Sequence, residues 1–387
     1  MATQSSGPLA AWPRLDRTPY GLRHSLAKAL VAFLVICLAG LSAFSAEYRI
    51  EPLGFLDGSY SKAEAINGSG RVVGYALTAP GPEHAFFWDG PALIDLGTLG
   101  GAASRAYDIN NRNQSAGWAQ NAAGQTRPVI WDDRVIRELP TLGGPTGSAR
   151  AINDSGQAVG NAYLTSSIYH AALWHDGRVD DLGTLGGTYS IAYDINTQGR
   201  IAGAAAEASG TQWATLWIDG TPRKLDALPG ATSSAARAIN DQDQAILWNY
   251  GVAHAALWDD GSVIDLGTFG GSQSWAYGLN NLGQVVGWAD LPSGIYHAFL
   301  WGDLNGNGGG DPGEMQDLGT LGGQFSSAYG INDSGVIVGY AQDALGRWEA
   351  VRWVPVPEPL SMLLLGTGLG AVLVVRARRR RRRRAGL

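Results

Sequence analysis

One stretch of the chain has the residue types and spacing of a calcium-binding loop. Residues 303–314 fit the pattern D-x-[DN]-x-[DN]-G-x5-E over all twelve positions. The candidate oxygen ligands are Asp303, Asn305, Asn307, the carbonyl of Gly309, Asp311 and Glu314. Because the flanking segments are predicted strands, we expect a structural Ca²⁺ loop without EF-hand helices. The alternative is an Asn- and Gly-rich hairpin insertion that binds no ion.

Four histidines suggest a metal or catalytic cluster, but their spacing argues against one. All four occupy the same position of an internal repeat: His84, His170, His254 and His297. A repeat fold places them on different units, so we expect structural, hydrogen-bonded histidines. No G-x-S-x-G, H-E-x-x-H, P-loop or dinucleotide fingerprint occurs in its proper setting. The sequence therefore assigns no catalytic or cofactor-binding residue, and an enzymatic role is not favoured.

The elements that carry these residues belong to a unit of about 43 residues that occurs seven times. Its marker is A-x-x-[IL]-N, which ends at Asn67, Asn110, Asn153, Asn196, Asn240, Asn280 and Asn332. Successive asparagines are 43, 43, 43, 44, 40 and 52 residues apart. A fixed period of this size indicates a repeat architecture.

Each unit contains four predicted strands. Strand a is the A-x-x-[IL]-N segment, and a turn follows whose fourth residue is always Gly, Asn or Asp. These residues tolerate the left-handed conformation that a tight turn with a bulge requires. Strand b reads V-V-G-[YW]-A, strand c reads H-A-x-x-W, and an Asp-Gly turn leads to strand d. A G-T-L-G-G linker then connects to the next unit.

Four antiparallel strands per unit predict an all-β fold, a seven-bladed β-propeller. The seventh unit stops after strand c at Trp353, whereas residues 48–54 resemble a strand d without a unit. We therefore expect the N-terminal strand to complete the last blade and close the ring, which removes exposed edges. A β-solenoid is the alternative, although it would not need this split. Units four and five are expected to be less regular, because residues 225–230 and 246–249 depart from the repeat.

The charge distribution limits the classes of molecule that the repeat region can bind. Residues 46–357 hold 16 basic and 32 acidic side chains, whereas eight arginines lie beyond residue 357. An acidic body argues against nucleic-acid binding, which needs basic grooves. It is compatible with cations or neutral polymers.

The N-terminal segment predicts export. Residues 1–45 combine a long lead-in, basic residues, an apolar run over 29–41 and small residues before Ala46, as in a Sec signal peptide. Cys37, the single cysteine, lies in that run, so the mature chain contains no thiol.

The C-terminal segment 356–387 contains Pro357, Glu358 and Pro359, an apolar run over 360–375, and an arginine cluster. The apolar run predicts a membrane helix with the arginines in the cytoplasm and the repeats outside. This order resembles the PEP-CTERM sorting signal. The resemblance implies a Gram-negative bacterium that makes an extracellular polysaccharide. It also implies an exosortase-type transpeptidase that cuts near residues 357–359, so the helix anchors the chain in the inner membrane only transiently.

The repeats of residues 46–355 resemble the extracellular HAF repeat family. The resemblance rests on the tripeptide His-Ala-Phe at residues 84–86 and 297–299. It implies an exported repeat protein of the outer surface or extracellular matrix, and it carries no defined activity.

Aromatic residues mark the expected ligand face. The variable b–c loops share one face with the d–a linkers, and variable loops on a rigid scaffold are common binding sites. These loops and the adjoining strand ends contain Tyr163, Tyr169, Trp213, Tyr250, Tyr296 and Trp348. Such side chains suit sugar rings or protein partners. The alternative is that they only cover blade edges.

Three functions follow from these features. The favoured one is a non-enzymatic binding or scaffold propeller whose partners are extracellular polysaccharide or surface proteins. An alternative is a carbohydrate-active hydrolase or lyase, which requires a pair of carboxylates that converge in the channel. A further alternative is a purely structural surface-layer component.

Overall fold

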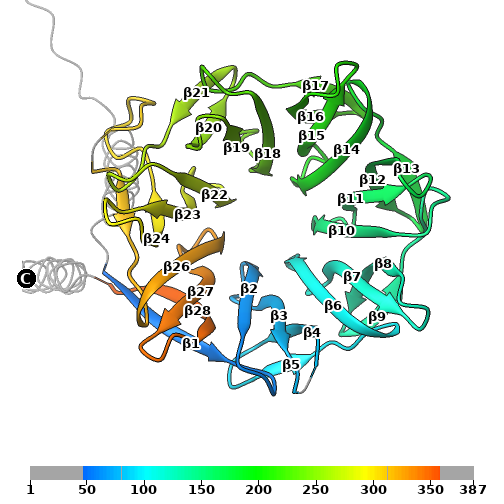
Figure 1. Cartoon of the computed structure of the whole chain (residues 1–387), viewed down its shortest axis with the longest axis horizontal. Helices are drawn as coiled ribbons and strands as arrows, with labels where there is room; N and C mark the ends of the chain where they lie inside the picture. The colour runs from blue at the N-terminus through cyan, green and yellow to red at the C-terminus, as the bar shows by residue number, and fades with distance from the viewer. Residues whose placement is uncertain (1–46, 80, 312, 358–387) are drawn as a thin grey trace, which may run out of the picture. The chain divides into compact units, whose positions relative to one another are not determined.

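Seven small antiparallel sheets form a ring in a computed structural model of the chain (Figure 1). The structure describes residues 47–79, 81–311 and 313–357. Each sheet has four strands, so the predicted seven-bladed β-propeller is confirmed. The chain divides into Met1–Ser45 and Ala46–Leu387, and the first unit lies outside the described residues. Within the described ranges, no helix has the length and apolar character needed to cross a membrane.

The first four blades follow the chain in order from the inner strand to the outer strand. Blade 1 consists of β2 (Ser61–Ile66), β3 (Val72–Leu77), β4 (Glu83–Trp88) and β5 (Leu93–Asp95). Blade 2 consists of β6 (Gly100–Ile109), β7 (Ser115–Asn121), β8 (Thr126–Asp132) and β9 (Val135–Glu138). Blade 3 consists of β10 (Gly147–Ile152), β11 (Ala158–Tyr163), β12 (Tyr169–His175) and β13 (Arg178–Asp181). Blade 4 consists of β14 (Gly186–Ile195), β15 (Ile201–Glu207), β16 (Gln212–Ile218) and β17 (Thr221–Lys224).

The remaining three blades complete the ring. Blade 5 consists of β18 (Ser233–Ile239), β19 (Ala245–Tyr250), β20 (Ala255–Asp259) and β21 (Ser262–Asp265). Blade 6 consists of β22 (Ser274–Leu279), β23 (Val285–Asp290), β24 (Tyr296–Trp301) and β25 (Met315–Asp317). Blade 7 combines β26 (Gly322–Ile331), β27 (Ile337–Asp343) and β28 (Trp348–Pro355) with β1 (Tyr48–Gly54).

The ring is closed by the first strand of the chain, as the sequence predicts. Strand β1 pairs antiparallel with β28, with Ile50 opposite Trp353. Arg352 on β28 donates to Glu51 on β1 across the same pair, with Nε and Oε2 2.6 Å apart. This pairing gives blade 7 its outer strand, so β28 has no open edge.

The turn between the first two strands of each blade adopts the predicted left-handed conformation. Its fourth residue has a φ between 63° and 83° in all seven blades: Gly70, Asn113, Gly156, Gly199, Asp243, Gly283 and Gly335. Only residues that accept a positive φ at low cost occur there. The seven inner strands therefore end in the same way, which keeps their last residues in register around the channel.

Blades 4 and 5 are complete four-stranded sheets, and the expected irregularity appears in blade 5, both in side-chain packing and in the shorter pairing of β19 with β20. In six blades the third residue of strand b is Gly, as at Gly203, where a Cβ would lie 2.1 Å from the Ile191 carbonyl oxygen. Blade 5 has Leu247 at this position, and Leu247 is fully buried. The strand c tryptophan of this blade, Trp258, is only half-buried, and its indole Nε1 has no hydrogen-bond partner among the described residues.

Tryptophan and apolar side chains hold neighbouring blades together. The indole Nε1 of Trp131 donates to the Leu96 carbonyl of the preceding blade at 3.0 Å, and Trp217 and Trp353 make the equivalent bonds. The apolar clusters also lie between blades rather than within them, as where Val73 and Phe87 pack with Trp131. Burial of this apolar surface is the main stabilising contribution to the ring.

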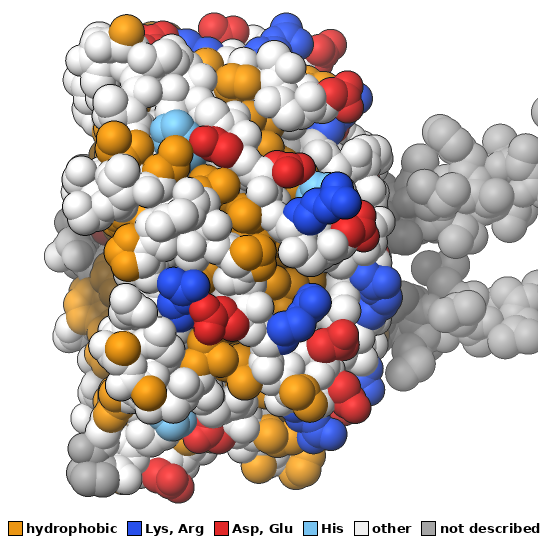
Figure 2. All heavy atoms as spheres, turned by 90° about the vertical axis from the view of Figure 1, so that its right-hand side faces the viewer, with side chains coloured by type: hydrophobic (Ala, Val, Ile, Leu, Met, Phe, Trp, Pro, Cys, Tyr) orange, Lys and Arg blue, Asp and Glu red, His pale blue; other side chains and the backbone are white. Residues whose placement is uncertain are grey.

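The outer wall carries charges of both signs. Figure 2 shows one side of the ring, where acidic and basic side chains lie beside one another among polar and hydrophobic ones. Such interspersed charges do not form a single-sign binding surface on this side.

Candidate functional site

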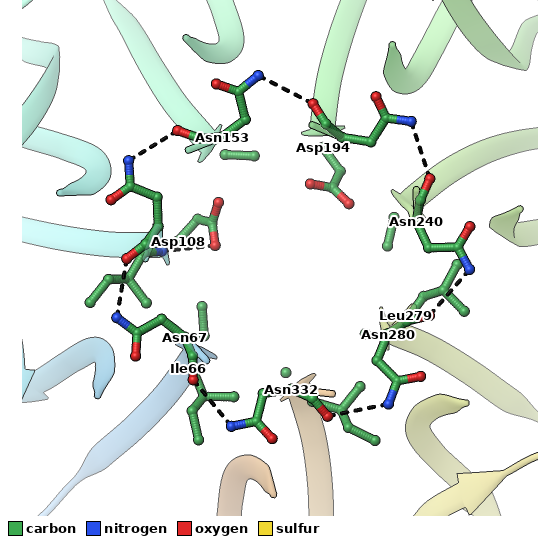
Figure 3. A pocket seen from close by; sticks show the side chains of 18 of the residues that line it. Ile66, Asn67, Asp108, Asn153, Asp194, Asn240, Leu279, Asn280 and Asn332 are labelled. Atoms are coloured by element: carbon green, nitrogen blue, oxygen red, sulfur yellow. Dashed lines mark hydrogen bonds between the residues drawn. The ribbon is translucent and has the colours of Figure 1, made fainter. Parts of the chain in front are cut away.

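The seven inner strands surround a cavity of about 470 Å³ in the channel of the ring (Figure 3). Every A-x-x-[IL]-N segment contributes to its wall, and the first turn residues after each segment form its rim. We call the side of the ring that carries these a–b turns the turn face. The opposite side, with the d–a linkers and b–c loops, is the linker face. None of the predicted ligand-face residues lines this cavity.

The repeated asparagines form a closed ring of hydrogen bonds around the cavity (Figure 3). Each side-chain Nδ2 donates to the backbone carbonyl of the asparagine in the next blade, at 3.0 to 3.2 Å. Asn332 closes the ring by donating to the Asn67 carbonyl, 265 residues away in sequence. Each Oδ1 also accepts from two backbone N–H groups of its own turn, as at Asn153. The motif ends in Asn because one amide group satisfies both the turn and the neighbouring blade.

Two carboxylates point into the cavity, Asp108 from blade 2 and Asp194 from blade 4 (Figure 3). Each accepts a hydrogen bond from the backbone N–H of the next residue and one from the isoleucine of a neighbouring blade. Asp108 accepts from Ile152 and Asp194 from Ile239, both at 2.8 Å. Burial, followed by the negative charge of Asp194, raises the pKa of Asp108 to about 7. These carboxylates connect blades, and every oxygen involved already faces an N–H donor.

A belt of cations and aromatic rings encircles the channel above the asparagine ring. It contains, in order around the channel, Lys62, Tyr75, Arg105, Trp118, Tyr107, Arg150, Tyr193, Arg237, Trp248, Tyr277 and Tyr329. We call this set the channel belt. Six members occupy the second position of an A-x-x-[IL]-N segment and two more, Lys62 and Arg105, precede such a segment, so strand a supplies most of the belt.

Cation–π contacts connect most neighbours in the channel belt. Lys62 Nζ lies 3.5 Å from the Tyr329 ring centroid, and the Arg105 guanidinium carbon lies 4.3 Å from that of Tyr75. The guanidinium carbon of Arg237 lies 3.9 Å from the Tyr193 centroid and 4.2 Å from that of Trp248. Because these rings are partly shielded from water, each contact contributes about 1 kcal/mol.

The four cations of the channel belt differ in their charge partners. Lys62 lies 2.9 Å from Glu64, and Arg105 forms two hydrogen bonds to Glu83, at 2.6 and 2.9 Å. Arg150 and Arg237 form no ion pair with any carboxylate among the described residues. Their Nε atoms are buried and have no hydrogen-bond partner there. Arg237 still interacts with its neighbours, since its side chain hydrogen-bonds to Tyr193 and its charge lowers the pKa of Asp194, which burial raises. The two guanidinium groups therefore lack an ion pair and a partner for Nε.

Two of the predicted ligand-face residues, Tyr296 and Trp348, belong to a continuous row of aromatic side chains. The row, which we call the aromatic chain, contains Trp288, Tyr296, Phe325, Trp348, Tyr340, Tyr329, Tyr277, Trp248, Trp275 and Tyr250. Successive ring centroids lie 4.3 to 5.9 Å apart, and all ten side chains are half-buried. The aromatic chain begins at the b–c strand ends of blades 6 and 7 and reaches the channel belt, with which it shares three members.

The other predicted aromatic residues lie elsewhere. Tyr163 and Tyr169 form a smaller cluster with Tyr189, with centroids 5.3 and 5.8 Å apart. Trp213 belongs to neither group: Lys224 Nζ lies 4.0 Å from its ring, and its indole Nε1 donates to Glu207. The structure thus divides the predicted set into two clusters and one separate residue, while Tyr250 lies at the end of the aromatic chain.

The histidines are placed as the sequence predicts, on four different blades. In each case Nδ1 lies within hydrogen-bond distance of the strand d aspartate, as in His84 with Asp95 at 2.8 Å. The same pair recurs in His170, His254 and His297. The aspartate also accepts the N–H of the following Gly, as at Gly97. This repeated motif fixes the start of each linker.

The predicted calcium loop lies between β24 and β25, on the turn face. Asp303 accepts the N–H groups of Gly306 and Gly308, and the Nδ2 atoms of Asn305 and Asn307 both lie 2.6 Å from Asp311 Oδ2. Glu314 is buried, and its carboxylate accepts the N–H groups of Leu304 and Asp311. Gly309 donates to Asn307.

The donors of this loop match a hard cation in type, because they are all oxygen atoms. In the described residues, no three His, Cys, Asp or Glu side chains gather around a common point. The carboxylates face backbone or amide N–H groups instead.

The sorting residues fall at the end of the described structure. Pro357 is the last described residue, whereas Glu358, Pro359 and the predicted membrane helix at 360–375 lie outside the described residues. The signal peptide, residues 1–45, also lies outside them.

The residues that sequence reasoning missed are those of the channel belt. Their signal was present in the repeat itself: the second position of A-x-x-[IL]-N reads Glu, Tyr, Arg, Tyr, Arg, Tyr and Tyr. Large polar and aromatic residues at one position of an otherwise uniform strand indicate a surface that is not used for blade packing. Strand a is innermost, so that surface is the channel.

Comparisons with known proteins give similar solved structures but no matching family or curated protein. No family model matches this sequence, and no curated protein matches it. Among solved structures, it is similar to catalytically inactive virginiamycin B lyase from Staphylococcus aureus with quinupristin, at a TM-score of 0.47 and 11% identity over 80% of this chain and 100% of that chain. TolB from Acinetobacter baumannii is similar at a TM-score of 0.41 and 14% identity, over 73% of this chain and 80% of that chain. These similarities concern the propeller fold alone.

Proposed function

We propose that this chain is an exported, non-enzymatic propeller that binds an extracellular polysaccharide at the bacterial surface or in its matrix. The observation that carries the proposal is the aromatic chain of blades 5 to 7. Ten half-buried rings follow one another from the strand ends near the b–c loops to the channel. Partly exposed aromatic faces are suited to stacking against successive sugar rings, because both surfaces are flat and apolar.

Two further features support a binding role. The region outside the terminal segments carries twice as many acidic as basic side chains, which disfavours nucleic acid as the polymer. Of the three carboxylates in the cavity wall, Asp108 and Asp194 already accept two backbone N–H groups each, and Glu64 is paired with Lys62. Carboxylates that connect blades in this way are not poised as an acid and base pair for glycoside cleavage.

The test mixes the full chain, purified in a mild detergent, with the extracellular polysaccharide of the producing bacterium. Size-exclusion chromatography then follows both protein co-elution and polymer length. We expect co-elution with intact polymer, and a loss of binding of at least tenfold in Trp348→Ala and Tyr296→Ala. Trp213→Ala is the matched control, since Trp213 is half-buried but lies outside the aromatic chain. Shortened polymer would instead identify a carbohydrate-active enzyme, and self-association without polymer would identify a surface-layer component.

We also propose Ca²⁺ as a structural ion of the loop at residues 303–314. The proposal is supported by the donor set and its twelve-residue spacing, with Glu314 buried at the end of the loop. Calcium is expected to raise the melting temperature of the full chain by several degrees relative to excess chelator. Asp303→Ala should abolish that difference, whereas Asp333→Ala, on a neighbouring turn, should retain it. An unchanged calcium effect in Asp303→Ala contradicts this proposal.

The remaining proposal concerns sorting. We infer that the chain is exported by Sec and processed by an exosortase-type transpeptidase, on the basis of the Pro-Glu-Pro, apolar and arginine-rich segments. Mass spectrometry of the mature chain should find a C-terminus near residues 357–359. Replacement of Pro357 and Pro359 by Ala should leave an uncut precursor in the inner membrane. A mature chain that retains its arginines would contradict processing.

A further inference from the structure

We propose that the channel cavity binds a hexuronate, a sugar ring with one carboxylate, and that Arg150 and Arg237 hold the carboxylate beside Tyr193. This inference goes beyond the polysaccharide site, because the cavity is lined by the inner strands and a–b turns. It uses neither Tyr296 nor Trp348.

Neither arginine forms an ion pair with a carboxylate in the part of the chain that the structure describes. Both line the cavity, and the Nε of each is buried without a hydrogen-bond partner among the described residues. In the same belt, the positive charge of Arg105 is compensated by Glu83, to which its guanidinium donates two hydrogen bonds. A desolvated charge without a partner is costly, so a ligand that supplies the missing anion gains binding energy.

The two positive charges lie close to the same aromatic ring. Arg150 and Arg237 come from the blades before and after that of Tyr193, and their guanidinium carbons lie 5.5 and 3.9 Å from its ring centroid. Burial lowers the pKa of Arg237, and the positive charge of Arg150 lowers it further. Two like charges this close repel, and an anion that contacts both removes the repulsion.

A carboxylate suits the two arginines better than a phosphate. The planar guanidinium fork matches either anion in shape. The cavity is also lined by six carboxylates, those of Glu64, Asp108 and Asp194 in its wall and of Asp154, Asp241 and Asp333 at its rim, and their negative charges disfavour an anion with more than one charge. Of the two anions, a single carboxylate is therefore the better fit.

The volume and lining of the cavity limit the size and polarity of the rest of the ligand. A volume of about 470 Å³ lies in the usual range for small-molecule sites, roughly 300–1,000 Å³. Four tyrosines line the cavity, Tyr107, Tyr193, Tyr277 and Tyr329, and its rim carries Asn, Asp, Thr and Ser side chains. Aromatic faces and a polar rim together suit a ring that carries hydroxyl groups. Free hexuronate and the terminal unit of an acidic polysaccharide both have this chemistry.

The experiment measures binding of D-glucuronate to the full chain by isothermal titration calorimetry in a mild detergent. D-Glucuronamide is the matched probe, because it keeps the ring and removes the charge. We expect glucuronate to bind at least tenfold more tightly than glucuronamide and than inorganic phosphate. A triglucuronate distinguishes the two sources: tighter binding of the trimer indicates a polymer end, and equal binding indicates free hexuronate.

Variants assign the binding to the two arginines. Arg150→Met and Arg237→Met should each weaken glucuronate binding at least tenfold, while Arg105→Met, whose guanidinium is already paired, should stay within about twofold. Arg237→Lys keeps the charge without the fork and should be intermediate. If a variant fails to fold, the shift of the wild-type melting temperature with glucuronate and not with glucuronamide still tests the site.

Three results would overturn the inference: equal affinity for glucuronate and glucuronamide, tighter binding of phosphate, or unchanged binding in both Arg→Met variants. The polysaccharide proposal is tested separately by Trp348→Ala, so either site can fail while the other stands.

Discussion

Six members of the channel belt lie on the same inner strands as the asparagine ring, each three residues before an asparagine, and the two sets differ in every other respect. The fifth position of the repeated segment is Asn in all seven blades, and each side chain makes the same bond to the next blade. The second position holds Glu, Tyr or Arg, and two of its charges have no ion-pair partner among the described residues. The uniform position holds the ring together, whereas the variable position gives the channel its chemistry.

The difference between these two positions shows where a repeat fold can vary its residues without loss of stability. A bond that joins each blade to the next must be made seven times, so one residue type serves every blade. A site for one ligand needs different groups from different blades. The channel belt provides them on a scaffold that is already fixed, so its side chains can vary without a change in the fold.

The largest expected effect comes from opening the asparagine ring. Asn153→Ala removes a donor to the Asn196 carbonyl and the acceptor of two turn N–H groups. Leaving these buried groups unpaired should lower the free energy of unfolding by about 3 kcal/mol. Urea unfolding measures the change. Asn111→Ala, whose exposed side chain contacts Asp154, is the control and should cost about 0.5 kcal/mol or less. Equal effects of the two changes would contradict the structural role of the ring.

A second effect is the pH dependence of the free energy of unfolding, which Asp108 controls. Burial, followed by the negative charge of Asp194, raises the pKa of Asp108 from its ordinary value of 3.8 to about 7 in the folded chain. Between these two values the folded state binds more protons than the unfolded state, so stability falls as pH rises. From pH 5 to pH 7 the loss should be about 2 kcal/mol.

The matched variant is Asp108→Ala, because Ala occupies this position in blades 1, 3 and 5. Urea unfolding at pH 5, 6, 7 and 8 should give a shallower decline for the variant than for the wild type. Parallel curves would show that the Asp108 carboxylate does not control this dependence.

A third, smaller effect tests whether the channel belt is retained for binding rather than stability. Without ligand, Arg237→Met removes an unpaired buried charge but also two cation–π contacts. We expect a change between zero and about 1 kcal/mol in the stabilising direction, measured by urea unfolding. A loss of more than about 1 kcal/mol would instead make Arg237 a structural residue like the asparagines.

The smallest effect is expected at the histidine motif of the outer strands. His254→Gln removes a partly exposed contact to Asp265, which lies 2.9 Å from Nδ1. Exposed pairs of this kind contribute about 0.5 kcal/mol. A larger loss in thermal or urea unfolding would show that this motif, too, is part of the structural framework.

Much of the fold was predictable because its determinants are local. The alternation along strands b and c, the left-handed residue of each a–b turn and the unpaired strand at residues 48–54 all appear in the sequence. The closure by β1 and the distribution of the histidines were predicted correctly for this reason. The candidate site was predicted only in part: Tyr296 and Trp348 belong to the aromatic chain, whereas Trp213 does not.

The sequence by itself determined the number of blades, the order of strands and the way in which the ring closes. The number of repeats gives the number of blades, and the strand that is missing from the last repeat is present before the first one. Only the tertiary structure decided which side chains meet in the channel. Arg150 and Arg237 are 87 residues apart, and Asn332 and Asn67 are 265 apart. Neither pair has a local signal, since their proximity arises from the curvature that blade packing imposes on seven separate strands.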